Sequence, residues 1–377
     1  MKNHAPLIII HFQPLELYPP VCNLINYLSL NSNERIIVIT TENKKEKKFQ
    51  CYTNCSEQIA IKRTFAINPT SPLRLFQYLF FYLNGLRLLL KQQPNSVLYF
   101  DTISSWPALM YKKMKGSKVK LMVHYHEYCS REEYANNMLL TRAMHRQEVK
   151  MYRHSYEWIS QTNKVRLQKM INDNHLENCD PSFFRAMPNY PSKYWAKSKT
   201  SYGISKKIRL VYVGSLGFHS TYLKELTEWA EKNTGHVTLD FYSHNIDEKA
   251  KSFLASVKDD CIRFQGSINY NELPNLLTNY DIGLVIYKPV SDNWIQNAPN
   301  KVFEYLACGL DVWFSKTMTY ALRLTTEETF PKIIPVDFEK LDEFDFKKAI
   351  NRDGLSYKET NFFYEDVYPD ILTEISK

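Results

Sequence analysis

The order of apolar and polar positions along the chain predicts short buried strands that alternate with amphipathic helices. Stretches such as "PLIIIHF" and "RIIVITT" have the length of single strands and contain few polar residues. Strands of this kind, separated by helices, are typical of parallel sheets covered by helices on both faces. We therefore expect strands at 6–12, 35–41, 96–102, 118–125, 156–161, 208–215, 237–243, 261–266, 281–287 and 311–315.

A segment rich in Pro, Ser and Lys, residues 187–207, interrupts this alternation, and we place a domain boundary there. The expected fold class is α/β, with two doubly wound, Rossmann-like domains facing a cleft. The first domain is expected to span 1–195 and the second 205–357, with a C-terminal helix in 358–377 that packs back on the first. Ligands of such sheets bind at the carboxyl ends of the strands, so the cleft is the expected site.

The bulk composition fits a globular protein with two domains. The chain has 377 residues, 44% of them apolar and 23% charged, and a formal net charge of +8. This mild basic excess suits an anionic substrate, an anionic membrane surface or nucleic acid without choosing between them. The seven cysteines are scattered and odd in number, which favours reduced thiols in the cytosol. No zinc-ligand spacing occurs, so no metal is expected.

The segment 73–93 is the most apolar helical stretch, and it permits two interpretations. It is either a core helix with a polar edge, or a helix that also contacts a membrane surface. Polar residues interrupt it too often for a membrane span, and the apolar run near the N-terminus is too short for a signal peptide. We expect a cytoplasmic protein, with peripheral contact to the inner membrane face as the added alternative.

The segment "NAPNKVFEYLACGLDVWFSKT", residues 297–317, places the carboxylate of Glu304 inside an apolar helix. Pro299 suits the first turn of this helix and Gly309 suits its C-terminal cap. Glu304 either forms a surface pair with Lys301 or faces a ligand. The helix N-terminus favours a phosphate, and a carboxylate further in can accept hydrogen bonds from ribose hydroxyls. If Glu304 faces a ligand, the segment predicts a nucleoside-diphosphate site.

The ordered set of motifs resembles glycosyltransferases of the GT-B fold, in the large retaining family 4. "YDIGLVIYKP…NAPNKVFEYLACGLDV" resembles their donor-binding segment, and "IRLVYVGS" resembles the first strand of their C-terminal domain. "VHYHEY" resembles a His-Glu motif of their N-terminal domain. "HRQEVKMYRHSYEWISQTNKVRLQKM" and "MPNYP" resemble the segments that follow it. The resemblance extends roughly over residues 95–315.

The resemblance implies roles for particular residues. Glu304 would bind the donor ribose. His126, with Glu127 beside it, would act near the transferred sugar, and His124 is the rival histidine. The remaining donor contacts would come from Gly214, Ser215, Asn300 and Lys301.

The sequence departs from the family at several of these places. A glutamate of the family is replaced by Gln296, which keeps hydrogen-bonding capacity without charge. The loop after the first C-domain strand lacks the usual basic pair, with only Lys224 and His219 nearby, and Asp311 replaces a proline. Gln296 is kept as a neutral donor contact.

The leading hypothesis is a glycosyltransferase that moves a hexose-like unit from a nucleoside-diphosphate sugar to a glycan or lipid-linked glycan, in cell-surface polysaccharide synthesis. It needs no cofactor and no metal, since no Asp-x-Asp motif is present. The first alternative is a catalytically weak GT-B protein that binds a nucleotide sugar or a partner without transfer. A nucleotide-sugar epimerase is less favoured. A nucleic-acid binder is least favoured, because the basic residues are dispersed.

Overall fold

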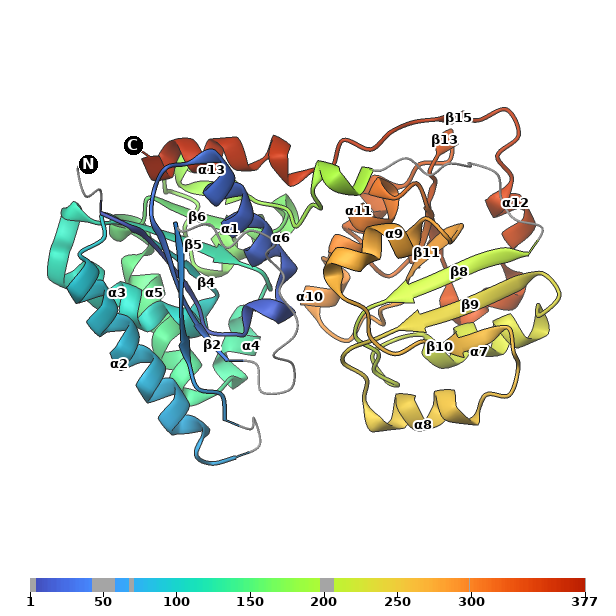
Figure 1. The fold of residues 1–377 in the computed structure, drawn as a ribbon, viewed down its shortest axis with the longest axis horizontal. Helices are drawn as coiled ribbons and strands as arrows, with labels where there is room; N and C mark the ends of the chain where they lie inside the picture. The colour runs from blue at the N-terminus through green and yellow to red at the C-terminus, as the bar shows by residue number, and fades with distance from the viewer. Residues whose placement is uncertain (1–4, 43–57, 68–70, 197–206, 298, 377) are drawn as a thin grey trace. The chain divides into compact units, whose positions relative to one another are not determined.

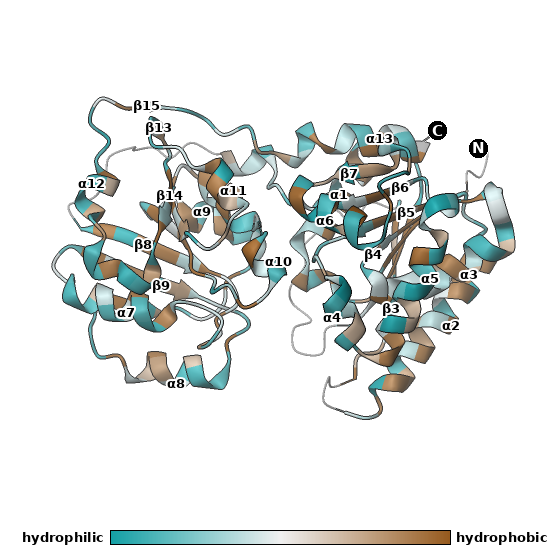
Figure 2. Cartoon of the chain, turned by 180° about the vertical axis from the view of Figure 1, so that it is seen from behind, coloured by the Kyte–Doolittle hydropathy of each residue, from teal (hydrophilic) through white to brown (hydrophobic). Residues whose placement is uncertain are grey.

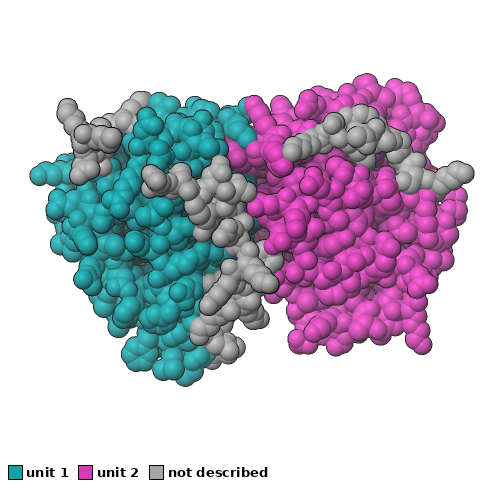
Figure 3. Space-filling model, viewed as in Figure 1, with its two compact units in different colours: residues 1–188, 365–377 teal, residues 189–364 magenta. Residues whose placement is uncertain are grey.

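The protein divides into two compact units, each with its own sheet. The computed structural model describes residues 5–42, 58–67, 71–196, 207–297 and 299–376. Unit 1 comprises Met1–Pro188 and Glu365–Lys377, and unit 2 comprises Asn189–Tyr364 (Figure 3). Both units are doubly wound α/β structures with parallel main sheets, so the predicted fold class is confirmed. The division falls at the start of the segment 187–207.

Unit 1 is built on a seven-stranded parallel sheet with the order β3-β2-β1-β4-β5-β6-β7. The strands are β1 (Leu7–His11), β2 (Ile36–Thr41), β3 (Ile59–Thr64), β4 (Ser96–Phe100), β5 (Lys120–Tyr125), β6 (Trp158–Gln161) and β7 (Phe184–Ala186). The strand order reverses direction between β1 and β4, which lie side by side in register from Leu7 and Ser96 to His11 and Phe100. Such a reversal is where doubly wound sheets bind ligands.

Helices cover both faces of this sheet (Figure 1). They are α1 (Pro19–Asn31), α2 (Arg74–Gln92), α3 (Ser105–Lys115), α4 (Arg131–Asn136), α5 (Leu139–Ser155), α6 (Lys164–Asp173) and α13 (Tyr368–Ser376). Because crossovers are right-handed, α1 lies on the face opposite α2, α3 and α5. The C-terminal helix α13 packs against α1, where the rings of Tyr27 and Tyr368 lie 5.5 Å apart.

Unit 2 is built on a six-stranded parallel sheet with the order β10-β9-β8-β11-β12-β14. Its strands are β8 (Ile208–Val213), β9 (Val237–Tyr242), β10 (Ile262–Phe264), β11 (Ile282–Val285), β12 (Asp311–Ser315) and β14 (Ile333–Val336), and β13 (Thr329–Phe330) pairs separately with β15 (Ser356–Tyr357). The helices are α7 (Leu223–Lys232), α8 (Glu248–Ser256), α9 (Leu273–Leu277), α10 (Asp292–Ile295), α11 (Asn300–Ala307) and α12 (Phe346–Ile350).

Alternate residues along the strands of unit 2 fill two separate cores. Leu210 and Tyr212 of β8 face the core that contains Leu226 and Trp229 of α7. Val211 of β8 faces the other core, together with Phe303 of α11. Side chains of successive strand residues point to opposite faces, so a strand buried on both faces reads as an unbroken apolar run. This explains why the apolar pattern identified these strands.

The cysteine prediction is wrong at one residue. Cys22 is disulfide-bonded, whereas Cys129, Cys179, Cys261 and Cys308 are free thiols. Spacing along a chain does not show which cysteines folding brings together, so the sequence could not identify this bond. The close pair at positions 51 and 55 lies outside the described residues. Among the helices of the described chain, none combines the length and apolar character needed to cross a membrane.

Candidate functional site

The first candidate site lies in unit 2, where the strand order reverses between β8 and β11. Gly214 and Ser215 follow β8 directly, and the loop after β11 leads through α10 into α11. The carboxyl ends of the two neighbouring parallel strands therefore meet at one edge, which is the ligand-binding edge of a doubly wound sheet. Helix α11 begins at Asn300, with Pro299 as its N-cap, and Gly309 follows it with a φ of 75°.

Glu304 lies buried on α11, with only 5% of its surface exposed. Its Oε1 accepts a hydrogen bond from Nδ2 of Asn300 at 2.8 Å. Burial raises the pKa of Glu304, whereas the nearby Lys301 and hydrogen bonds from Asn300 and Tyr270 oppose that rise. Glu304 therefore does not belong to an exposed surface pair, and the structure surrounds its carboxylate with neutral donors and one cation.

Lys301 supplies positive charge to the loop after β8. Its side chain lies over Gly214, where a Cβ atom would come within 2.2 Å of Lys301 Cε and 2.9 Å of Nζ. The same ammonium lies 5.6 Å from the centre of the Tyr287 ring. Because residue 214 has no side chain, a cation from α11 reaches the end of β8. The loop after β8 lacks the two basic residues expected from the motif resemblance, so Lys301 is a source of positive charge for an anion at the end of β8.

The position of α11 on the sheet is fixed by Tyr305. Its hydroxyl accepts a hydrogen bond from the N–H of Val213 at 3.1 Å, so it holds the end of β8. A Cβ atom on Gly283 of β11 would lie 2.2 Å from the Tyr305 ring, which shows how closely ring and strand pack. A side chain at position 283 would push the helix away. Tyr305 and Gly283 thereby place the neighbouring Glu304 at the sheet edge.

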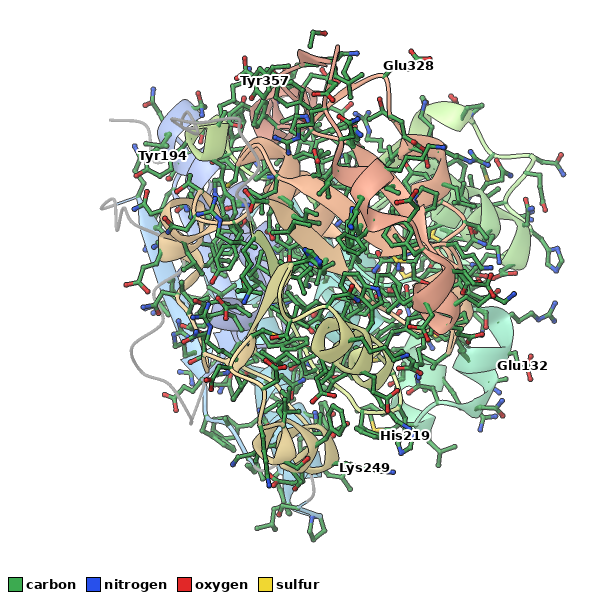
Figure 4. All side chains as sticks on the ribbon, turned by 90° about the vertical axis from the view of Figure 1, so that its right-hand side faces the viewer. Glu132, Tyr194, His219, Lys249, Glu328 and Tyr357 are labelled. Atoms are coloured by element: carbon green, nitrogen blue, oxygen red, sulfur yellow. The ribbon has the colours of Figure 1, made fainter. Side chains whose placement is uncertain are left out.

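The other basic residues considered near the loop after β8 are engaged elsewhere. Lys224 forms an ion pair with Glu228 at 3.6 Å. His219 Nε2 lies 3.0 Å from Lys249 Nζ, and both side chains lie on an outer surface of unit 2 (Figure 4). Gln296 is the C-cap of α10, half-buried on the path to α11. Lys301 is thus the cation whose contact with Gly214 the structure shows.

The contacts of Asp311 explain why a carboxylate stands at this position, where the motif resemblance leads one to expect a proline. It is fully buried at the start of β12, and its carboxylate pairs with Arg352 at 3.0 Å. The same carboxylate accepts the backbone N–H of Lys332 at 2.7 Å. The aspartate that replaces the expected proline therefore connects β12 to the segment that enters β14. Its contacts do not involve Glu304.

The second candidate site lies in unit 1, at the carboxyl ends of β1, β4 and β5. His124 is in β5, and His126 follows this strand; their rings are 4.9 Å apart. The His126 ring stacks on Phe100 at 5.0 Å, and both of its nitrogens are buried without a hydrogen-bond partner in the part of the chain that the structure describes. His124 Nδ1 lies 2.8 Å from Ser160 Oγ, so His124 is held by the sheet while His126 is available to a further group.

Burial keeps these imidazoles neutral near pH 7. It lowers the pKa of His124 to about 3, and it lowers the pKa of His126 well below its usual value, with the neighbouring His124 and His11 adding to the effect. Neutral imidazole can donate one hydrogen bond and accept another. The pair therefore offers polar groups without positive charge.

No hydrogen bond between the Glu127 carboxylate and the imidazole of His126 is seen among the described residues. Its carboxylate lies 3.8 Å from the guanidinium of Arg166 and is largely exposed. Arg166 is buried and also donates to the carbonyl oxygen of His126 at 3.1 Å. The structure thus joins Glu127 to His126 through Arg166, by a contact to the backbone and not to the imidazole.

Two residues that the motifs did not identify belong to the same cluster. His11 ends β1 and lies 6.0 Å from His126 between ring centres, and Asp101 follows β4 and accepts the N–H of His126 at 2.8 Å. Burial lowers the pKa of His11 to about 4 and raises the pKa of Asp101 to about 7. Both residues stand at the ends of predicted strands, and that position was the signal that could have found them.

Comparisons with known proteins support the fold. No protein-family model matches the chain, and no curated protein sequence matches it. Among solved structures, the apo form of the lipopolysaccharide outer core galactosyltransferase WaaB has a TM-score of 0.62 at 12% identity, covering 98% of this chain and 99% of that chain. HepE (Alr3699) of Anabaena, in complex with UDP-glucose, has a TM-score of 0.66 at 12% identity, covering 98% and 99%.

A third similar structure is the sucrose-phosphate synthase of Thermosynechococcus elongatus. Its TM-score is 0.64 at 13% identity, covering 98% of this chain and 97% of that chain. These likenesses extend over both units, and they show that the chain has the two-domain fold of GT-B glycosyltransferases.

Proposed function

We propose that this chain is a glycosyltransferase that moves a hexose-like unit from a nucleoside-diphosphate sugar to a glycan or lipid-linked glycan. The observation that carries the proposal is the buried Glu304 on α11, at the ligand-binding edge of unit 2. A carboxylate is rarely buried without strong partners. Here Asn300 and Tyr270 supply hydrogen bonds and Lys301 a nearby positive charge, and the vicinal hydroxyls of a ribose would supply further hydrogen bonds.

The diphosphate of the donor would bind beside Glu304. The positive end of the helix dipole at the start of α11 favours an anion, and Lys301 adds a full positive charge over Gly214. Ser215 continues the same loop, and Gln296 offers a neutral contact to the sugar. The solved HepE complexes hold UDP and UDP-glucose, so UDP-glucose is the first donor to try.

In this proposal His126 of unit 1 is the catalytic imidazole and contacts the transferred sugar. A neutral imidazole can hydrogen-bond a sugar hydroxyl or stabilise charge that develops at the anomeric carbon. Glu127 would assist through Arg166. The motif resemblance supports a retaining enzyme of family 4 that uses no divalent ion on the diphosphate. The likeness to a lipopolysaccharide galactosyltransferase supports a role in cell-surface polysaccharide synthesis on the cytoplasmic side.

Gln296 motivates the alternative function, a protein that binds a nucleotide sugar or a partner without transfer. At this position an amide replaces the carboxylate of the family, so one charged contact to the donor is absent. Binding and transfer respond differently to this loss. A binding protein would be stabilised by a nucleotide sugar and would release no nucleoside diphosphate.

The test is a panel of nucleoside-diphosphate sugars, beginning with UDP-glucose. A donor that binds the folded chain at 100 times its Kd stabilises it by about 2.7 kcal/mol, so we expect a rise of several degrees in melting temperature. Release of nucleoside diphosphate is then measured with the stabilising donor, with and without glycan acceptors. Stabilisation with nucleotide release supports the transferase, stabilisation alone supports the binding protein, and no response across the panel contradicts both.

The exposed side of α2 supports the expected membrane contact. Phe76, Leu79, Phe80 and Leu83 lie on this side, and each is more than half exposed; brown segments recur along the helix in Figure 2. The helix contains no acidic residue. Basic residues are present as well: Arg87 and Lys91 of α2 and Lys62 of β3 help to line a cavity of about 230 Å³ between these two elements. Apolar and basic surface together suit an anionic phospholipid bilayer.

The double variant Phe76→Gln, Phe80→Gln is expected to bind anionic vesicles at least tenfold more weakly than the wild type, because each phenylalanine ring would otherwise bury apolar area in the lipid. Arg87→Gln with Lys91→Gln should also weaken binding, by about 1 kcal/mol per charge at low salt. Vesicle flotation at two salt concentrations measures both. Leu322→Gln in unit 2, an exposed leucine away from α2, is the matched control. Wild type that never floats with anionic vesicles would remove the membrane role.

A further inference from the structure

Three side chains at the switch point of unit 1 converge on one small volume. His11 ends β1, Asp101 follows β4, and His126 follows β5. One nitrogen or oxygen atom from each lies within 4.8 Å of the corresponding atoms of the other two. Both histidines are at least nine-tenths buried, and Asp101 is partly exposed. The strands β1, β4 and β5 are neighbours in the sheet, so this convergence follows from the fold.

The hydrogen bonds of His11 determine which of its nitrogens is available. Nδ1 lies 2.7 Å from the carbonyl oxygen of Gln13, and a carbonyl oxygen can only accept. Nδ1 therefore carries the hydrogen, and Nε2 presents a lone pair. Nε2 is buried and has no hydrogen-bond partner in the described residues. A backbone carbonyl on the far nitrogen is the arrangement that orients histidines bound to metal ions.

His126 and Asp101 provide the other two atoms. Both ring nitrogens of His126 are buried without a hydrogen-bond partner among the residues described, although its ring is held by stacking on Phe100. Asp101 is oriented by the N–H of His126, which donates to Oδ1 at 2.8 Å. Its backbone has a φ of 56° and a ψ of 154°, a strained conformation for a residue with a side chain. Such strain persists where the surrounding structure enforces it, often at functional sites.

We propose that His11, Asp101 and His126 bind one zinc ion. Two imidazole nitrogens and one carboxylate oxygen are a set found at protein zinc sites, with a fourth position left for water. Two ligand atoms on a tetrahedral zinc ion lie about 3.4 Å apart, given bonds of about 2.1 Å. The three atoms, which now lie within 4.8 Å of one another, would therefore move closer together by up to about 1.4 Å when the ion binds.

An ion would use one nitrogen from each histidine, so the second ring nitrogen of His126 would remain for the contact with the transferred sugar proposed above. Zinc would satisfy the buried lone pairs directly and would join the ends of three central strands. This proposal shares His126 with the proposed transfer reaction but does not depend on that reaction, because its test measures bound metal.

The metal was not foreseen from sequence spacing because the three ligands are far apart along the chain. Zinc motifs are recognised by short intervals between ligands, whereas these residues meet through parallel strand pairing. The site is also separate from the donor diphosphate, for which no metal is proposed. A transferase that needs no divalent ion on its donor and a zinc ion in unit 1 are therefore compatible.

The test uses the full chain without a polyhistidine tag, first freed of metal with a chelator. Zinc content after dialysis is expected to be one ion per chain, and Co²⁺ is expected to give the visible absorption of a four-coordinate site. Zinc affinity should fall at least about 100-fold in His11→Gln and in Asp101→Asn, more than the loss of an outer hydrogen bond would cause. His219→Gln, an exposed histidine in unit 2, should bind zinc as the wild type does.

Folding is checked independently of the metal. Asn has nearly the same shape as Asp and lacks only the charge, so Asp101→Asn retains the shape of the side chain at this position. Circular dichroism should be unchanged in this variant, and zinc should raise the melting temperature of the wild type but not of either ligand variant. A wild-type chain that retains less than about a tenth of an equivalent of zinc overturns the proposal. Equal affinity in wild type and His11→Gln overturns it as well.

Discussion

His126→Ala is expected to lower the turnover number at least about 100-fold while leaving donor affinity within about twofold of the wild type. The reason is that His126 is the proposed catalytic imidazole, whereas the donor groups come from unit 2. A group that acts only in the transition state affects turnover and not ground-state binding. Steady-state kinetics and calorimetric titration with the preferred donor, both in excess chelator, separate the two quantities.

Two further variants show whether the effect belongs to the imidazole of His126. His126→Gln retains bulk beside Phe100, so it limits the cavity that alanine would leave under a stacked ring. His124→Ala removes the neighbouring histidine, which is held by Ser160. If His124→Ala lowers turnover and His126→Ala does not, the roles are exchanged. If His126→Gln folds and turns over normally, His126 is a structural histidine.

Glu304→Ala is expected to weaken donor binding by about 10- to 100-fold. Hydrogen bonds to a charged group contribute roughly 1.5–3 kcal/mol each, and 1.4 kcal/mol corresponds to a factor of ten. The fold without ligand should keep its stability or gain some, because burial raises the pKa of this carboxyl and so disfavours its charged form. Calorimetric titration with the donor and melting curves without it measure the two effects.

The control for this prediction is Glu231→Ala, an exposed carboxylate on α7 in the same unit. It should change neither donor affinity nor stability measurably. Glu304→Gln is the conservative variant. Its amide can still accept from Asn300, but it retains only one oxygen for two ribose hydroxyls, so we expect an intermediate loss of affinity. Unchanged donor affinity in Glu304→Ala would refute the ribose role and remove the main support for the transferase.

The apolar pattern by itself predicted the central strands of both sheets. Strands such as β1 and β4 are buried on both faces, so no polar residue is required inside them and the run is visible in the sequence. Three edge strands, β3, β7 and β14, were missed for the converse reason, whereas the edge strand β10 was predicted at 261–266. β3 contains Lys62 and Arg63 and is mostly half-exposed, β7 has three residues, and β14 contains Pro335. Proline is tolerated at an edge, but in a sequence it argues against a strand.

The local chemistry around Glu304 was also visible in the sequence. Pro299 before the helix, Gly309 after it and an acidic residue among apolar ones are all neighbours along the chain. Local sequence could not decide whether Glu304 was exposed or which residues surround it. Tyr305 reaching Val213, and Lys301 lying over Gly214, depend on how α11 packs against the ends of β8 and β11.

Only the tertiary structure assembled the cluster of unit 1. The sequence determined that His11, Asp101 and His126 each follow or end a buried strand, and the motif resemblance singled out His126 alone. Parallel strands joined by helices align their carboxyl ends at one edge, whatever the length of chain between them. The order β1-β4-β5 decided which three ends became neighbours, and burial then left Nε2 of His11 and both ring nitrogens of His126 without hydrogen-bond partners among the described residues.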